Sequence, residues 1–199
     1  NTGSANALIA KDGSSQGWGF YLTGGGTPNW QTDETTNHLF ASSLGTGTWY
    51  HLAVTQTGGL LKGYINGVED LSTSYTDHTD ATGALQIGKF VNQSNRQFDG
   101  LVDEVRIWSV ARTAQEINDN KGSELNGNET GLVAYWKLNN SLADTTTNGF
   151  TLTTANSPSF SGDAAFSAPA EDLSNRKSTN ESVTSSTVMQ SDDQLKLSL

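Results

Sequence analysis

Acidic side chains near the middle of the chain are the first candidates for chemistry. Asp103 and Glu104 are neighbours in a predicted strand. Neighbouring side chains on a strand point to opposite faces, so this pair cannot flank one glycosidic bond as the two carboxyls of a glycosidase do. Asp99 and Asp103 share a face, and carboxylate oxygens are ligands that calcium prefers. We predict a structural calcium ion at Asp99 and Asp103; the alternative is that Asp103 accepts hydrogen bonds from turn amides and Glu104 pairs with Arg106.

Aromatic residues are the candidates for sugar binding, because a flat ring stacks on the apolar face of a pyranose while polar neighbours bind the hydroxyls. Trp30 stands among turn residues and is the tryptophan expected to be exposed. Tyr75, Asp77 and His78 belong to the polar loop 72–82. The predicted ligand-binding residues are therefore Trp30, Tyr75, Asp77 and His78, with core packing of Trp30 and an ordinary exposed loop as the alternatives. For the tryptophans expected in strands we predict core packing: Trp49, Trp108 and Trp136.

Composition excludes several classes of function. The formal net charge is -10, and no cluster of Lys and Arg exists that could bind nucleic acid phosphates. The chain has no cysteine, which excludes a disulfide scaffold, a zinc-thiolate site and a thiol nucleophile. No apolar run approaches the ~18 residues of a membrane-spanning helix. The first residue is Asn1, with neither an initiator Met nor a signal peptide, so we expect a processed or excised piece of a larger protein.

Short runs of alternating apolar residues predict an all-β, antiparallel sandwich. The strand at 48–57 should place Tyr50, Leu52 and Val54 on one face. Asn66 and Gly67 predict a tight hairpin turn, because a type I′ turn needs positive φ at both central residues. The predicted strands cover residues 7–10, 17–23, 37–41, 48–57, 60–65, 84–89, 101–110, 132–138 and 150–154.

One short helix is predicted after the strand 101–110. Thr113 and Glu116 fit a capping box, and Gly122 would end the helix. From about residue 167 no periodic apolar face persists, so 167–199 is interpreted as a linker or disordered tail. Within this tail, residues 194–199 have the composition of one isolated strand.

Three segments resemble the laminin-G-like jelly-roll domains of the concanavalin A-like lectin/glucanase superfamily. One resembles the central hairpin of that family: GTWYHLAVT at 47–55 and LKGYING at 61–67. The second resembles its most recognisable stretch, with echoes of the pentraxins: FDGLVDEVRIW at 98–108. The third resembles the strand that usually opens such a domain: GLVAYWKL at 131–138. The resemblance implies a jelly-roll sandwich of the concanavalin A-like type with one short helix over residues 1–166.

The order of these segments departs from the family, because the opening strand of the family comes late in this chain. Either residues 131–166 start a second repeat, or they fold back and complete a sandwich whose strand order is permuted. The glucanases of the superfamily carry a Glu-x-Asp-x-(x)-Glu arrangement on one strand, and this chain lacks it. The resemblance also implies a place near Asp99 and Asp103 where related domains can hold a structural ion.

These observations predict a non-catalytic carbohydrate-binding or adhesion module of a larger, secreted or cell-surface protein. Its expected partner is a glycan or a glycosylated protein, with no nucleic acid and no membrane insertion. The alternative is a structural spacer or protein-interaction domain without a ligand of its own, and a glycoside hydrolase ranks third. The sequence does not specify the oligomeric state.

Overall fold

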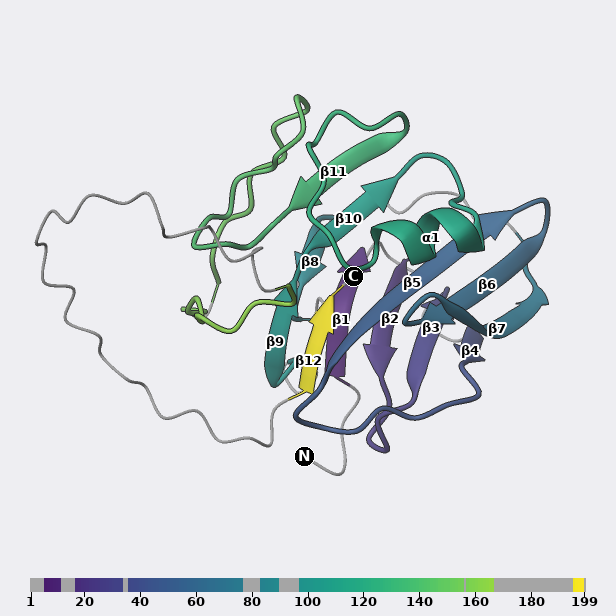
Figure 1. The fold of residues 1–199 in the computed structure, drawn as a ribbon. Coiled ribbons are helices and arrows are strands. Elements are labelled where there is room, and N and C mark those ends of the chain that lie inside the picture. Colours follow the sequence, from purple (N-terminus) through teal and green to yellow (C-terminus); the bar gives the residue numbers. More distant parts are fainter. Residues whose placement is uncertain are drawn as a thin grey trace, which may run out of the picture.

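The protein is described by a computed structural model, which covers residues 6–11, 17–33, 36–76, 83–89, 97–155, 157–166 and, as a strand, 195–198. Two five-stranded sheets and a two-stranded sheet make up an all-β sandwich, as the sequence predicts. Figure 1 shows the first sheet behind the second, with the helix beside the second. No helix in the described part of the chain is long and apolar enough to span a membrane.

The first sheet has the order β4-β3-β2-β1-β8. Its strands are β1 (Asn6–Lys11), β2 (Trp18–Leu22), β3 (Pro28–Thr32), β4 (Thr36–Leu39) and β8 (Leu85–Ile87). Strand β3 is missing from the sequence prediction, which places 28–31 in a turn. That prediction is wrong: Trp30 lies within a strand, paired with Phe20 of β2 and with His38 of β4.

The second sheet has the order β7-β6-β5-β12-β9. Its strands are β5 (Trp49–Thr57), β6 (Leu60–Ile65), β7 (Val68–Ser74), β9 (Gly100–Asp103) and β12 (Leu195–Ser198). The predicted turn between β6 and β7 is confirmed, with φ of 52° at Asn66 and 81° at Gly67. Strand β7 extends to Ser74, into the predicted polar loop. The rest of the predicted tail, 167–194 and 199, lies outside the described residues.

A third, two-stranded sheet joins β10 (Val105–Trp108) to β11 (Leu132–Trp136). The predicted continuous strand 101–110 is wrong at Glu104, where φ is +56° and the chain bends between β9 and β10. The left-handed conformation at Glu104 ends the alternation of side chains that a single strand would have. A second prediction also fails, because residues 150–154 form no strand.

The helix α1 (Ala114–Asn120) follows β10 and begins as predicted. The Thr113 hydroxyl accepts the Glu116 amide at 3.2 Å, and the Glu116 carboxylate accepts the Thr113 amide at 2.8 Å. This reciprocal pair satisfies two of the amides that the first turn of a helix leaves without partners. The helix ends at Asn120, ahead of Gly122.

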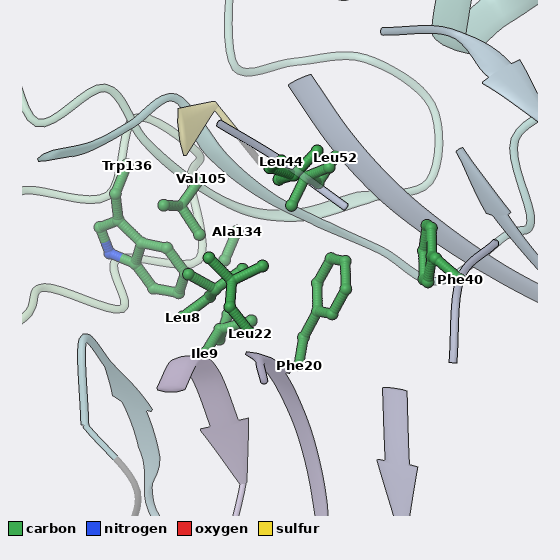
Figure 2. Close-up of a cluster of buried hydrophobic side chains, with 10 residues drawn as sticks. All are labelled: Leu8, Ile9, Phe20, Leu22, Phe40, Leu44, Leu52, Val105, Ala134 and Trp136. Carbon is green, nitrogen blue, oxygen red and sulfur yellow. The ribbon is translucent and has the colours of Figure 1, made fainter. Parts of the chain in front are cut away.

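The core lies where all three sheets meet. Figure 2 shows Leu8 and Leu22 of the first sheet pointing toward Val105, Ala134 and Trp136. Leu52 of the second sheet is a buried member of this core cluster, and Tyr50 and Val54 pack against the cluster. The three side chains therefore share one face of β5, as predicted. Because Ala134 and Trp136 are each only 2% exposed, strand β11 contributes to this core.

Candidate functional site

Two of the predicted ligand-binding residues lie in one cleft between the sheets. Trp30 stacks on Trp18, with ring centroids 4.9 Å apart and planes 19° apart. Tyr75, just after β7, packs edge-on against His38 at 5.8 Å. Both Trp30 and Tyr75 line the cleft. The other two predicted residues, Asp77 and His78, lie outside the described residues.

We call this space the inter-sheet cleft; its volume is about 470 Å³, within the usual range for small-molecule sites. Strands β2 and β3 form one wall of the cleft, and β5 forms the opposite wall. Strand β10 and helix α1 supply further lining residues. The aromatic residues that line it are Trp18, Phe20, Trp30, Tyr75 and Trp108. Trp108, predicted as a core residue, is half-buried and lies at the cleft; Trp136 alone of the three packing candidates is fully buried.

Buried polar atoms without a hydrogen-bond partner in the described part of the chain are concentrated on residues of this cleft. They are Trp30 Nε1, Thr32 Oγ1, His51 Nδ1 and Arg106 Nε. A buried donor or acceptor that loses water and gains no partner costs about 1–3 kcal/mol. Groups of this kind within a cavity are suited to binding the hydroxyls of a ligand. No sequence pattern marks them, because they come from β3, β5 and β10, which are distant along the chain.

Arg112 covers one side of the cleft. Its guanidinium lies 4.4 Å from the centroid of the Trp108 ring and 2.9 Å from the Glu116 carboxylate. Both residues and Glu116 line the cleft. The guanidinium over the indole face restricts the side chains of Arg112 and Trp108. The charge of Arg112 is paired with the Glu116 carboxylate.

The electrostatic environment of His51 keeps its imidazole neutral. Burial, as the largest cause, and the positive charges of Arg106 and Lys121 together lower the pKa of His51 from 6.5 to about 4. At neutral pH the cleft therefore presents an uncharged imidazole. It can exchange hydrogen bonds with a neutral ligand but cannot form an ion pair with an anionic one.

His51 should make the stability of the domain sensitive to acid. Because its folded pKa lies below the unfolded value, its contribution is fully present above pH 6.5 and is lost as the pH falls toward 4. At pH 5 the loss should be about 2 kcal/mol. Urea unfolding of the wild type and of His51→Gln at pH 8 and pH 5 checks this, since other titrating groups are common to both. Equal pH dependence in the two proteins would contradict it.

The two carboxylates of the predicted calcium site differ in burial. The Asp103 side chain is buried and accepts the Ala165 amide at 2.9 Å and the Glu104 amide at 3.0 Å. Burial raises the pKa of Asp103, and its effect exceeds that of the two hydrogen bonds, which lower the pKa. Asp99 is exposed. Among the described residues no group of three or more His, Asp or Glu is placed to hold a metal ion, and calcium at Asp99 and Asp103 stays a prediction.

Glu104, at the bend between β9 and β10, is buried and forms the ion pair that was the alternative prediction. Its Oε2 lies 2.6 Å from Arg106 Nη2 and accepts the Tyr135 hydroxyl at 2.5 Å. Arg106 also donates to the carbonyls of Asn120 and Ser123. Burial raises the pKa of Glu104, and the hydrogen bonds from Tyr135 and Arg106 lower it. The network connects β10, β11 and the end of α1, which fixes one wall of the cleft.

A second cavity of about 670 Å³ lies between β8, β9 and the segment 138–164. Most of its side chains are apolar, with Leu85, Phe98 and Leu152 among them. Gln86 Oε1 is its one buried polar side-chain atom without a partner among the described residues. The inter-sheet cleft differs from it in carrying four such atoms on its lining residues.

The first of two comparisons with solved structures agrees with this fold. A solved structure of a Bacteroides ovatus protein, provisionally assigned as carbohydrate-binding, is 23% identical with a TM-score of 0.56 over 69% of this chain and 42% of its own. A Clostridium thermocellum S-layer domain-containing protein, residues 221–444, gives 21% identity and a TM-score of 0.36 over 61% of this chain and 65% of its own.

Among curated proteins, mouse (Mus musculus) pappalysin-1 is 34% identical over 77 residues, which are 36% of this chain and 5% of pappalysin-1. The chain thus spans only a small part of that relative. The model of the concanavalin A-like lectin/glucanases superfamily, in its laminin G form, matches residues 1–118. That match covers more than half of the sequence, and the chain belongs to the concanavalin A-like lectin/glucanases superfamily.

Proposed function

We propose that this domain is a non-catalytic carbohydrate-binding module of a larger extracellular protein, and that it binds a neutral glycan in the inter-sheet cleft. The observation that carries the proposal is the combination found there. Stacked Trp18 and Trp30 lie beside buried polar atoms that have no hydrogen-bond partner among the described residues. Sugars present apolar ring faces and hydroxyls together, and this combination matches both.

The comparisons support the same class of ligand. The superfamily contains lectins by its description, and the Bacteroides ovatus protein of similar fold is provisionally assigned as carbohydrate-binding. Glycan polymers occur mainly outside the cell. We therefore propose an extracellular location for the parent protein.

Binding without catalysis is supported by the charged groups of the cleft. Glycoside hydrolysis needs two carboxyls about 5–10 Å apart across the scissile bond. Among the described residues that line the cleft, Glu116 is the only carboxylate, and it caps α1 and pairs with Arg112. Glu104 and Asp103 do not line it.

A neutral rather than an anionic glycan is favoured by the pairing of the cleft's cations. Arg106 is engaged by the Glu104 carboxylate and by two backbone carbonyls. Arg112 is paired with Glu116, and His51 is uncharged at neutral pH because of its lowered pKa. With a formal net charge of -10 on the chain, long-range attraction of an anionic polymer is absent.

A glycan array probed with the purified protein, in calcium and in chelator, tests the proposal. We expect binding to neutral oligosaccharides, and Trp30→Ala should weaken it at least tenfold, since loss of about 1.4 kcal/mol of contact energy gives that factor. Trp49→Ala is the matched control, because Trp49 lies outside the cleft and donates to Asp163. Far-UV circular dichroism confirms that both variants are folded.

Each other outcome has a distinct meaning. If Trp49→Ala weakens binding as much as Trp30→Ala, the cleft is not the site. If no glycan binds in either condition, the proposal fails and the domain is a spacer or protein-interaction module. Binding that requires calcium would support the predicted ion at Asp99 and Asp103.

A further inference from the structure

The C-terminal strand β12 occupies an unusual place in the second sheet. It lies between β5 and β9 and is parallel to both, whereas the pairings between the other described strands are antiparallel. Lys196 is in register with Trp49 on one side and with Leu101 on the other. Figure 1 shows β12 as the yellow strand beside β9.

Strands β5 and β9 do not pair with each other, so they leave a slot that is one strand wide. Within the described strands, β12 is the only sheet neighbour of β9, and β5 has β6 on its other side. The slot thus presents two facing rows of backbone N–H and C=O groups. Such edges recruit extended segments through main-chain hydrogen bonds, largely independent of side-chain identity.

The connection to β12 is long enough to reach a neighbouring molecule. Residues 167–194 separate β12 from the last described part of the body. About 28 residues of chain have a maximum span of roughly 95 Å. A folded body of this size has a diameter of roughly 40 Å, from a radius of gyration of about 15 Å. Covalent geometry therefore allows β12 to enter the slot of a second copy.

Leaving its own slot should cost β12 little. It is four residues long, and parallel pairing is slightly less stable per residue than antiparallel pairing. A strand that moves to an identical slot in another copy recovers the same backbone pairing, which is why exchange of an identical element is a low-cost route to dimers. We propose that the slot between β5 and β9 is a strand-acceptor site, and that the β12 strand of one copy fills the slot of another. This proposal does not depend on glycan binding.

Engineered cysteines in the full chain test the exchange, because the protein has none of its own. One chain carries Leu101→Cys in the acceptor strand β9, and a second chain, with a size tag, carries Lys196→Cys in β12. These positions are direct partners in register, close enough for a disulfide. After mixing under mild oxidation, a cross-linked heterodimer should accumulate with time and with protein concentration.

A matched mixture measures random cross-linking. Ser72→Cys lies on the exposed outer strand β7, away from the slot, and is mixed with the same Lys196→Cys chain. We expect at least ten times more heterodimer from the Leu101→Cys mixture. A chain with both Leu101→Cys and Lys196→Cys should also form an internal disulfide at high dilution.

Two results would overturn the proposal. If the double variant closes its internal disulfide while the Leu101→Cys mixture gives no more heterodimer than the Ser72→Cys mixture, β12 stays with its own chain. If the double variant forms neither an internal disulfide at high dilution nor a cross-link between copies, β12 does not occupy the slot at all. Neither result bears on glycan binding in the inter-sheet cleft, because positions 72, 101 and 196 do not line it.

Discussion

Replacing Glu104 by alanine is expected to destabilise the domain by about 3–5 kcal/mol, the usual cost of removing one partner of a buried ion pair. The Arg106 guanidinium would stay buried with only carbonyl partners, and the Tyr135 hydroxyl would lose its acceptor. Domains of this kind have about 5–15 kcal/mol of stability, so the variant should unfold at much lower urea concentration. Urea unfolding followed by far-UV circular dichroism measures the change.

Two variants isolate the cause. Glu69→Ala removes the same type of side chain from the exposed Lys62–Glu69 pair, and the free energy of unfolding should barely change. Glu104→Gln keeps the shape and a hydrogen-bonding group, and its loss of stability should fall between those of the two alanine variants. If Glu104→Ala behaves like Glu69→Ala, the buried network does not hold β10, β11 and α1 together.

The turn between β6 and β7 and the start of α1 could be predicted because their signals are local. Asn66 and Gly67 need only their own backbone preferences to specify the turn. Thr113 and Glu116 specify the helix start through contacts three residues apart. In such cases neighbouring residues carry the whole physical cause.

Strand β3 was missed because one of its two faces is buried through polar side chains. Asn29 and Gln31 are 1% and 6% exposed, and both donate to Asn37 Oδ1, at 2.8 Å and 3.2 Å. The Tyr21 hydroxyl donates to the same oxygen at 2.7 Å. A strand buried through side-chain hydrogen bonds lacks the apolar alternation on which sequence prediction depends. Pro28 at its start added to the appearance of a turn.

The candidate site could be predicted only in part for a related reason. Trp30 and Tyr75 were selected for their chemistry, and both line the cleft. The other groups depend on which strands face each other across the sandwich: His51 of β5 lies opposite β3, and Trp108 of β10 completes the wall. The bend at Glu104 is equally hidden, because a glutamate with positive φ has no sequence signature.

Strand β11 provides the test of whether residues 131–166 belong to this domain. Trp136 is 2% exposed, packs in the core with Val105 and Ala134, and donates its indole N–H to the Phe150 carbonyl at 2.7 Å. Trp136→Ala should therefore lower the free energy of unfolding of the whole sandwich by about 3–5 kcal/mol. If these residues instead began a second repeat, the main unfolding transition would not move.

The control for Trp136→Ala comes from the same segment. Phe150 is 53% exposed, and Phe150→Ala keeps the backbone carbonyl that accepts the indole, so its effect should stay within about 0.5 kcal/mol. Far-UV circular dichroism is the suitable probe, because the substitution itself removes a fluorophore. Shortening the chain to end at Asn128 removes both β11 and β12 and should destabilise the sandwich more than Trp136→Ala does. Strand β10 would lose its only described sheet neighbour and the core contacts, and β5 and β9 would lose the strand between them. A shortened chain that melts like the full one would show that residues 1–128 hold the sandwich together without β11 and β12.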